Sequence, residues 1–371
     1  MKRTVETATL FAALLALSCS PEPPPQAERK PMTGAEFRAM IQPAPRTAVL
    51  AEEGWFDWGA SMVRSADGKC HLYYAQWPAE TQMSGWLSDS VISYATADNP
   101  LGPYQPQGII LKGRGGDYWD AEMVHNPTIK KFGEKYYLYH IGTRKTATFD
   151  DYRQRGIFRD KPSTHADDHA NRRVNQRIGV AVADSPEGPW QRFEEPIIDV
   201  EPGGIRHYFV CNPSVTETPE GDYLMVYKSM DADSRMVHGV ARADKPEGPF
   251  QCYPDPIFTA GDDGFPAEDP FIGHSGGGYY AIVKDFKGSF TGHTGGHSLA
   301  LFYSTDGIDW RPTEDPLVST TEIRWTDGTT EKLSNLERPQ LWLDNGRPAV
   351  LFCAARSPRV PRSFNVHIPL Q

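Results

Sequence analysis

Short apolar and aromatic strands, separated by turn residues, recur along the chain as five pairs. The second strand of each pair follows a turn and is rich in aromatic and β-branched residues, which is typical of the return strand of a hairpin. The five return strands span 68–77, 133–143, 221–230, 277–286 and 345–355. The strands before them span 58–65, 125–132, 211–218, 268–275 and 337–344, and four of these open with one residue, then Asn, Asp or Arg, then Pro.

A second phrase recurs between these hairpins. It is a strand that ends in a Pro-Gly turn and an aromatic residue, as in YATADNPLGPY (94–104), VAVADSPEGPW (180–190) and GVARADKPEGPF (239–250), with the variant LFYSTDGIDW at 301–310. A short outer strand follows each turn, so every unit holds four strands. Five such sheets predict an all-β fold, a five-bladed β-propeller with four-stranded blades. We expect Thr47 to Leu50 to supply the outermost strand of the fifth blade, so that N- and C-terminal strands close the ring.

A polar insertion at 144–176 interrupts the second blade between its second and third strands. Its charged residues and histidines favour a surface loop or lid, part of which could be helical.

Composition agrees with this fold and narrows the function. The chain has 33 Gly and 32 Pro in 371 residues, which suits many strands and turns. The net charge of −10 argues against a nucleic-acid partner, because phosphate binding requires a basic face. The widely spaced cysteines lack metal-site spacing, so Cys70 and Cys353 are expected as buried free thiols. No metal and no other cofactor is predicted.

The N-terminus carries export signals. Residues 1–19 contain Lys2 and Arg3, an apolar run and a small residue before Cys19, which is typical of a secretory signal. The Cys19 position resembles a bacterial lipobox, and the alternative is ordinary cleavage nearby. A Pro-rich tether is expected over 20–45, followed by a catalytic propeller over 46–371. The chain is therefore expected to be exported and lipid-anchored at the bacterial cell surface or in the periplasm.

Polar residues gather where the predicted blades meet. The innermost strands of a propeller line its axis, so their openings converge at one end, to which the second strands return. The openings carry Asp57, His125, Asn126, Asn212, Glu268, Asp269 and Glu337, the returning ends carry Trp77, Lys228, Lys284 and Asp285, and Asp120 precedes the second opening. Carboxylates, amides and an indole suit a sugar, whose hydroxyls need polar partners and whose faces stack on aromatic rings.

Two opposed carboxyl groups suit cleavage of a glycosidic bond. We expect Asp57 to act as the base and Glu268 as the acid, with the pKa of Glu268 raised by neighbours such as Asp269. Structural alternatives stay open at several positions. The Asn-Pro pairs could be a structural feature of the repeat with no role in ligand binding. Glu337 and Arg338 could form an ion pair, and Trp58 and Trp86 could be packing residues.

The phrases FDWGASMV, HNPTI, NPSV, AEDPFI and LERPQL, over roughly 50–355, resemble the five-bladed propeller glycosidases related to glycoside hydrolase family 43. The resemblance implies a first-blade Asp as base, a third-blade Asp that tunes the acid, a fourth-blade Glu as acid, and inversion of the anomeric centre. Asp57 and Glu268 stand for the base and the acid. Asn212 occupies the third-blade position, so the tuning would come from Asp269 or Asp120.

Three functions are compatible with these features. The first is an exo-acting glycoside hydrolase that trims plant or algal polysaccharides, whose substrate would be anionic if Lys228, Lys284 and His125 at the rim bind a uronate or sulfate. The second is a glycoside phosphorylase like those of the related propeller family 130, in which the same cations would hold phosphate. The third is a non-catalytic glycan-binding propeller.

Overall fold

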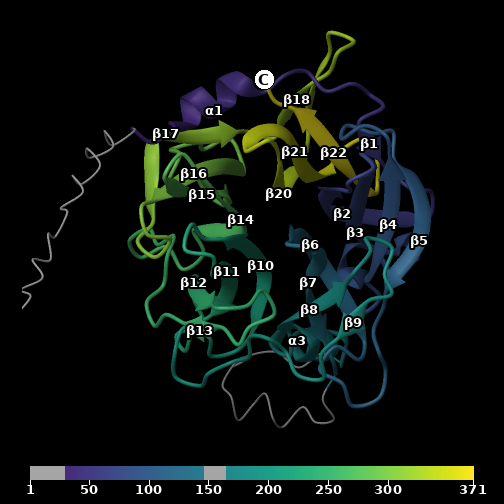
Figure 1. Cartoon of the computed structure of the whole chain (residues 1–371), viewed down its shortest axis with the longest axis vertical. Coiled ribbons are helices and arrows are strands. Elements are labelled where there is room, and N and C mark those ends of the chain that lie inside the picture. Colours follow the sequence, from purple (N-terminus) through teal and green to yellow (C-terminus); the bar gives the residue numbers. More distant parts are fainter. Residues whose placement is uncertain (1–29, 146–163) are drawn as a thin grey trace, which may run out of the picture. The chain divides into compact units, whose positions relative to one another are not determined.

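Five four-stranded antiparallel sheets surround a common axis (Figure 1). The computed structural model describes residues 30–145 and 164–371, and the chain from Pro31 to Gln371 forms one unit. The all-β five-bladed propeller with four-stranded blades is therefore confirmed. The signal segment and Cys19 lie outside the described residues. Within the described ranges, no helix is long and apolar enough to cross a bilayer.

The blades follow one another in chain order, each beginning at the axis and ending at the periphery. The first holds β2 (Trp55–Arg64), β3 (Cys70–Pro78), β4 (Val91–Ala97) and β5 (Gln105–Leu111), and the second holds β6 (Met123–Phe132), β7 (Lys135–Thr143), β8 (Arg177–Ala183) and β9 (Gln191–Arg192). The third holds β10 (Val210–Glu217), β11 (Tyr223–Met230), β12 (Met236–Ala243) and β13 (Gln251–Cys252), and the fourth holds β14 (Ala267–Ser275), β15 (Gly278–Asp285), β16 (Ser298–Ser304) and β17 (Arg311–Ser319).

The fifth blade joins the two ends of the propeller. It consists of β20 (Asn335–Asp344), β21 (Arg347–Arg356), β22 (Ser363–Pro369) and, outermost, β1 (Val49–Leu50). Val49 pairs with Val366 and Leu50 with Asn365, which confirms the predicted closure of the ring. Outside the blades lie α1 (Gly34–Met40), η1 (Ala79–Thr81), η2 (Met83–Leu87), α3 (Thr164–Val174) and the hairpin of β18 (Glu322–Arg324) and β19 (Thr330–Lys332).

The hydrophobic core is divided among the interfaces between neighbouring blades. Between blades one and two, for example, Tyr73 and Ile92 pack with Leu138, and each is fully buried. A sheet that is covered on both faces needs apolar residues on both, which explains the continuous apolar runs of the inner strands. Cys70 and Cys353 are buried and free, as predicted.

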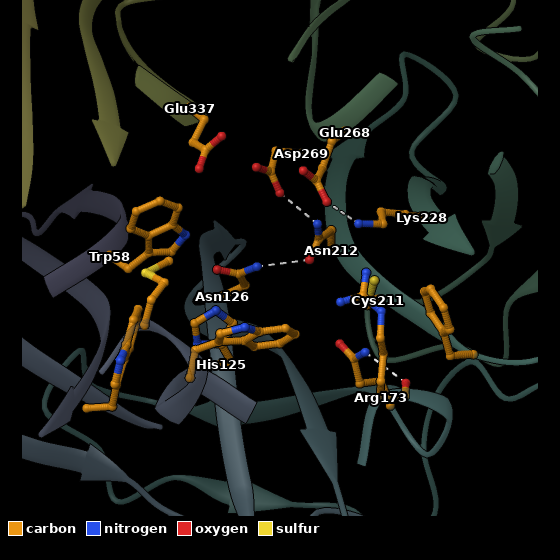
Figure 2. A pocket seen from close by; sticks show the side chains of 15 residues that line it. Trp58, His125, Asn126, Arg173, Cys211, Asn212, Lys228, Glu268, Asp269 and Glu337 are labelled. Carbon is orange, nitrogen blue, oxygen red and sulfur yellow. Dashed lines mark hydrogen bonds and ion pairs between the residues drawn. The ribbon is translucent and has the colours of Figure 1, made fainter. Parts of the chain in front are cut away.

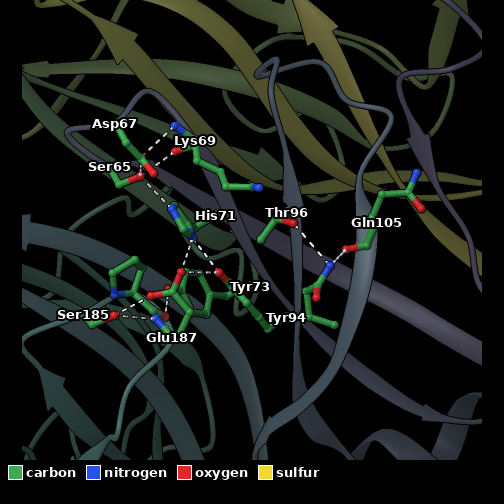
Figure 3. Close-up of polar contacts among 12 residues, drawn as sticks. Ser65, Asp67, Lys69, His71, Tyr73, Tyr94, Thr96, Gln105, Ser185 and Glu187 are labelled. Atoms are coloured by element: carbon green, nitrogen blue, oxygen red, sulfur yellow. Dashed lines mark hydrogen bonds and ion pairs between the residues drawn. The ribbon is translucent and has the colours of Figure 1, made fainter.

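The repeated Pro-Gly turn connects neighbouring blades at two junctions. The Tyr73 hydroxyl of blade one donates to the Pro186 carbonyl in the turn of blade two, and Tyr139 of blade two donates at 2.6 Å to the Pro246 carbonyl of blade three. Figure 3 shows Tyr73 among its polar neighbours at this junction, where Tyr94 also donates to the carboxylate of Glu187 at 3.4 Å. The phrase therefore recurs because it joins blades.

The segment before β1 packs on the propeller. Helix α1 begins with a capping box, in which the Glu36 N–H donates to the Thr33 hydroxyl at 3.1 Å and the Thr33 N–H donates to the Glu36 carboxylate at 2.7 Å. Phe37 of this helix is 2% exposed and belongs to the core between blades four and five. The unit from Pro31 to Gln371 therefore includes α1, because an apolar face of this helix completes that core.

A β-bulge at the same place in all five innermost strands shapes the axis. The register with the second strand breaks between residues 58 and 61, 125 and 128, 211 and 214, 268 and 271, and 337 and 340. The second residue of each bulge has a positive φ between 50° and 60°: Gly59, Asn126, Asn212, Asp269 and Arg338. Asn, Asp and Gly tolerate this conformation best, which explains most of the repeated opening phrase.

Candidate active site

A pocket of about 210 Å³ lies at one end of the propeller axis (Figure 2). Each blade contributes the first bulge residue of its innermost strand: Trp58, His125, Cys211, Glu268 and Glu337. The remaining lining residues are Trp77, Met83, Trp86, Asn126, Arg173, Gln176, Phe209, Asn212, Lys228 and Asp269. The strand openings thus meet at one mouth, as the repeat predicted.

The bulges decide which residues enter the pocket. In a regular strand, successive side chains point to opposite faces of the sheet. In blades two, three and four both bulge residues line the pocket, namely His125 with Asn126, Cys211 with Asn212, and Glu268 with Asp269. A bulge therefore doubles the number of polar groups that one strand presents to the site.

The second bulge residues connect to one another beneath the pocket. The Asn126 amide donates to Asn212 at 2.9 Å, and the Asn212 amide donates to the Asp269 carboxylate at 2.7 Å. Arg338 is fully buried and donates to the Asn126 carbonyl at 2.9 Å. A Cβ on Gly59 would lie 2.9 Å from the Cγ of Arg338, so blade one needs glycine where blade five supplies arginine. The Asn-Pro pairs thus combine a backbone role with a place in the pocket.

Glu268 is held by two lysines, which contradicts its predicted protonation. Its Oε1 pairs with Lys228, its Oε2 pairs with Lys284 at 3.0 Å, and Lys284 also pairs with Glu337. Burial alone would raise the pKa of Glu268, but the two ammonium groups outweigh burial and hold the pKa well below its usual range. The lysines therefore favour the ionised form of Glu268, opposite to the predicted direction of its pKa shift. Glu337 pairs with Lys284, and the alternative ion pair with Arg338 is not found among the described residues.

Asp269 is the pocket carboxyl group that resists ionisation. Burial raises its pKa to about 6, the charge of Glu268 adds to the rise, and Arg338 and Lys284 partly offset it. The site thus holds two adjacent carboxyl groups whose pKa values are shifted in opposite directions.

Asp57 does not reach the pocket. It is fully buried and does not line the cavity, because the first bulge residue of blade one is the next residue along the strand, Trp58. Its carboxyl oxygens accept from the Glu52 backbone N–H at 2.6 Å and from the Gln76 amide at 3.0 Å. Of the two expected catalytic residues, only Glu268 therefore lines this pocket. Burial raises the pKa of Asp57 to about 7.

Two further predicted binding residues stabilise loops instead. Asp120 is fully buried, pairs with Arg114 at 2.6 Å and Arg192 at 3.1 Å, and lies outside the pocket lining. Asp285 is also fully buried, and its oxygens accept four backbone N–H groups of residues 288–291, which fixes the loop after β15. Both carboxylates are thus occupied by internal donors and lie outside the pocket lining.

The other predicted binding residues lie at the site. Trp77, His125, Asn126, Asn212, Lys228, Asp269 and Glu337 line the pocket, and Lys284 supports it through Glu268 and Glu337. His125 is neutral, because burial lowers its pKa to about 3, and its Nδ1 lies 2.8 Å from the Ser90 hydroxyl. It therefore offers no positive charge to an anionic sugar.

Aromatic rings form one wall of the pocket. The rings of Trp58 and Trp77 lie 6.4 Å apart at 58°, and Trp86 of η2 lies 5.0 Å from His125. Trp58 and Trp86, which the sequence left as packing residues, thus line the pocket. Trp58 could have been found by aligning the five strand openings, since it occupies the position of His125 and Glu268.

The polar insertion in blade two supplies residues that the sequence did not indicate. It ends in α3, whose last turn places Arg173 at the pocket, followed by Gln176. Residues 146–163 of the expected loop or lid lie outside the described residues. No repeat covers this segment, so its place could not be deduced from the blade pattern.

Comparison with known proteins supports the fold assignment. No family model matches the chain. The extracellular endo-α-(1→5)-L-arabinanase 2 of Bacillus subtilis is 24% identical over 200 residues, which make up 52% of this chain and 36% of that protein. The match therefore spans only about a third of the length of this curated relative.

Solved structures resemble the chain over most of its length. A family 117 glycoside hydrolase of the marine bacterium Zobellia galactanivorans has a TM-score of 0.58 and 17% identity, with 89% of each chain covered. An endo-arabinase from Bacteroides thetaiotaomicron has a TM-score of 0.57 and 13% identity, with 89% of this chain and 97% of that chain covered. The chain thus has the propeller fold of these glycoside hydrolases, and its resemblance to the family 43 type is confirmed at the level of the fold.

Proposed function

We propose that this protein is a glycoside hydrolase that cleaves a glycosidic bond in a plant or algal oligosaccharide or polysaccharide. The observation that carries this proposal is a pocket with three carboxyl groups in unlike settings, since lysines lower the pKa of Glu268 and pair with Glu337, while burial raises the pKa of Asp269 to about 6. Carboxyl groups with separated pKa values are what acid and base catalysis requires. The tryptophan wall and the fold shared with known glycoside hydrolases agree with a sugar substrate.

In this mechanism Asp269 donates its proton to the leaving glycosidic oxygen. Glu337, which shares one lysine with Glu268, accepts a proton from the water that attacks the anomeric carbon as the bond to the leaving oxygen breaks. Glu268 has a lysine on each of its oxygens and is the poorer base. Attack by water on the face opposite the leaving group inverts the anomeric centre. NMR of the first product formed reports its configuration, and retention would exclude this route.

The shape of the site favours action on chain ends. The linked side chains of Asn126, Asn212 and Asp269, together with Arg338, lie across the axis beneath the pocket. A glycan that enters the mouth meets this floor, so one terminal sugar is the part that fits. Release of monosaccharide from the start of the reaction would support exo action, whereas early release of long fragments would show internal cleavage.

The acid is tested with leaving groups of different strength. Asp269→Asn should reduce hydrolysis of a natural oligosaccharide by about 10²- to 10⁴-fold. The same variant should keep most of its activity on a dinitrophenyl glycoside, whose leaving group needs no protonation. Glu337→Gln should lose activity on both substrates, since attack by water still requires a base. Equal losses for Asp269→Asn on both substrates would exclude it as the proton donor.

Export and lipid anchoring are proposed from the N-terminal residues. The Bacillus subtilis relative is extracellular, which agrees with export of this chain. Cys19 would carry the lipid and the residues after it would hold the propeller away from the membrane. Metabolic labelling with a radioactive fatty acid should mark the wild type and not Cys19→Ser. Secretion of an unlabelled wild-type protein into the medium would indicate ordinary cleavage.

Non-catalytic glycan binding is the second candidate. It is favoured by the double ion pair on Glu268, which neutralises the residue that the family resemblance assigns as acid. Tight binding of a glycan, with no product from any substrate and no effect of Asp269→Asn on affinity, would establish this function. Phosphorolysis has weaker support than it had from the sequence, because the two lysines expected to hold phosphate are paired with carboxylates.

A further inference from the structure

The two lysines of the site are both paired with carboxylates. Lys228 and Lys284 are each paired with Glu268, and Lys284 also with Glu337. Arg173 lines the same pocket, yet no carboxylate in residues 30–145 and 164–371 pairs with its guanidinium. The guanidinium contacts an aromatic ring instead, since its Cζ lies 5.9 Å from the ring centre of Phe209. The pocket therefore holds a cation available to a ligand.

Contacts of the neighbouring Arg172 explain the orientation of Arg173. Arg172 forms a bidentate pair with Glu122, with Nε–Oε2 at 2.9 Å and Nη2–Oε1 at 3.3 Å, and its carbonyl accepts from the Thr143 hydroxyl at 2.6 Å. These contacts fix the last turn of α3. Adjacent helical residues point about 100° apart, so anchoring Arg172 turns Arg173 toward the cavity, where Figure 2 shows it.

The Arg173 backbone is held as well. Gln176, which is 2% exposed, donates to the Arg173 carbonyl at 2.8 Å. Cys211 beside it does not neutralise the guanidinium, because burial raises the pKa of this thiol to about 11 although the charges of Lys228 and Arg173 partly offset the rise. An arginine in a fixed segment presents a rigid fork of donors that fits a carboxylate or a sulfate with two hydrogen bonds.

We propose that the pocket binds an anionic sugar, a uronate or a sulfated residue, and that Arg173 binds its acidic group. This inference rests on the proposed function, because it assumes that the ligand is a glycan. It adds that the glycan is acidic. It moves the expected anion contact from Lys228, Lys284 and His125 to Arg173.

The test measures binding with matched pairs of oligosaccharides. One pair consists of pectin-derived oligogalacturonides and the same material after reduction of the carboxyl groups to alcohols. The second consists of sulfated algal galactan oligosaccharides before and after desulfation, and inorganic phosphate is a separate probe. Affinities are measured by calorimetry in the Asp269→Asn background, so that they do not depend on turnover. The exposed Arg347→Ala is the control, because it removes the same charge outside the pocket lining.

We expect the acidic member of one pair to bind at least about tenfold more tightly than its neutral partner. Arg173→Gln should abolish that preference, Arg173→Lys should retain part of it, and Arg347→Ala should leave it unchanged. The pair that responds distinguishes a uronate from a sulfated sugar. Equal affinity within both pairs, a preference that survives Arg173→Gln, or phosphate binding through Arg173 without any sugar preference would overturn the proposal.

The two proposals fail in different ways. An acidic preference that depends on Arg173, found in a protein whose wild type releases no product, would refute hydrolysis and leave the anion site standing. Hydrolysis of neutral glycans that is unaffected by Arg173→Gln would refute the anion site and support hydrolysis.

Discussion

Asp57→Asn tests the placement of the first-blade acid. Asp57 is fully buried at the start of β2, away from the pocket lining, and accepts hydrogen bonds from the Glu52 backbone and the Gln76 side chain. Burial raises its pKa from 3.8 to about 7. We therefore expect the substitution to leave glycan binding and hydrolysis close to wild type, while it changes how the stability of the fold depends on pH.

The magnitude follows from the difference between folded and unfolded pKa values. A carboxyl group whose pKa is raised by folding contributes its full stabilisation below the unfolded value of 3.8, and loses it as the pH rises through about 7. At 1.36 kcal/mol per pH unit, this interval corresponds to about 4 kcal/mol. Asn has no proton to lose, so the free energy of unfolding of the variant minus that of the wild type should rise by about 4 kcal/mol between about pH 4 and pH 8.

Urea unfolding at a series of pH values measures this difference, with glycan binding followed in the same preparations. The Asn amide cannot accept both hydrogen bonds, which adds a pH-independent cost of about 1–3 kcal/mol. This cost shifts the whole curve without changing its slope. A difference that stays constant over the pH range would refute the burial argument. Loss of hydrolysis with intact binding would instead indicate that Asp57 has a catalytic role.

Three further predictions concern the pocket, the axis and the N-terminal helix. Glu268→Gln leaves two buried lysines without their shared partner and should lower the free energy of unfolding in urea by about 3–5 kcal/mol. The substitution should also lower the pKa of Asp269 and so move the alkaline limb of the pH–activity curve to lower pH. Gly59→Ala, at φ 60° and facing a filled channel, should cost more in thermal unfolding than Gly54→Ala, whose Cβ would meet open space, and equal costs would contradict the clash. Phe37→Ala should cost about 3–5 kcal/mol in urea unfolding, whereas a tether residue would cost nothing.

The fold was accessible from the sequence because its evidence is repeated. Five copies of a hairpin and three copies of a Pro-Gly turn predicted the blade count, the closure of the ring and the end at which strand openings meet. Each copy obeys the same local physics, since a short apolar strand between turns pairs with its neighbour wherever it occurs. The membership of His125, Asn212, Lys228 and Glu337 in the site followed from that repeat alone.

The chemistry of the site depended on contacts between blades, which no single strand encodes. A shift of one residue at the first bulge exchanged Asp57 for Trp58 at the pocket, because side chains alternate along a strand. The lysines that ionise Glu268 come from β11 of blade three and β15 of its own blade, and the unpaired Arg173 comes from an insertion outside the repeat. Local pattern thus determined the architecture. Charge, burial and hydrogen bonding between distant residues exist only in the assembled ring, and they set the opposite pKa shifts of Glu268 and Asp269.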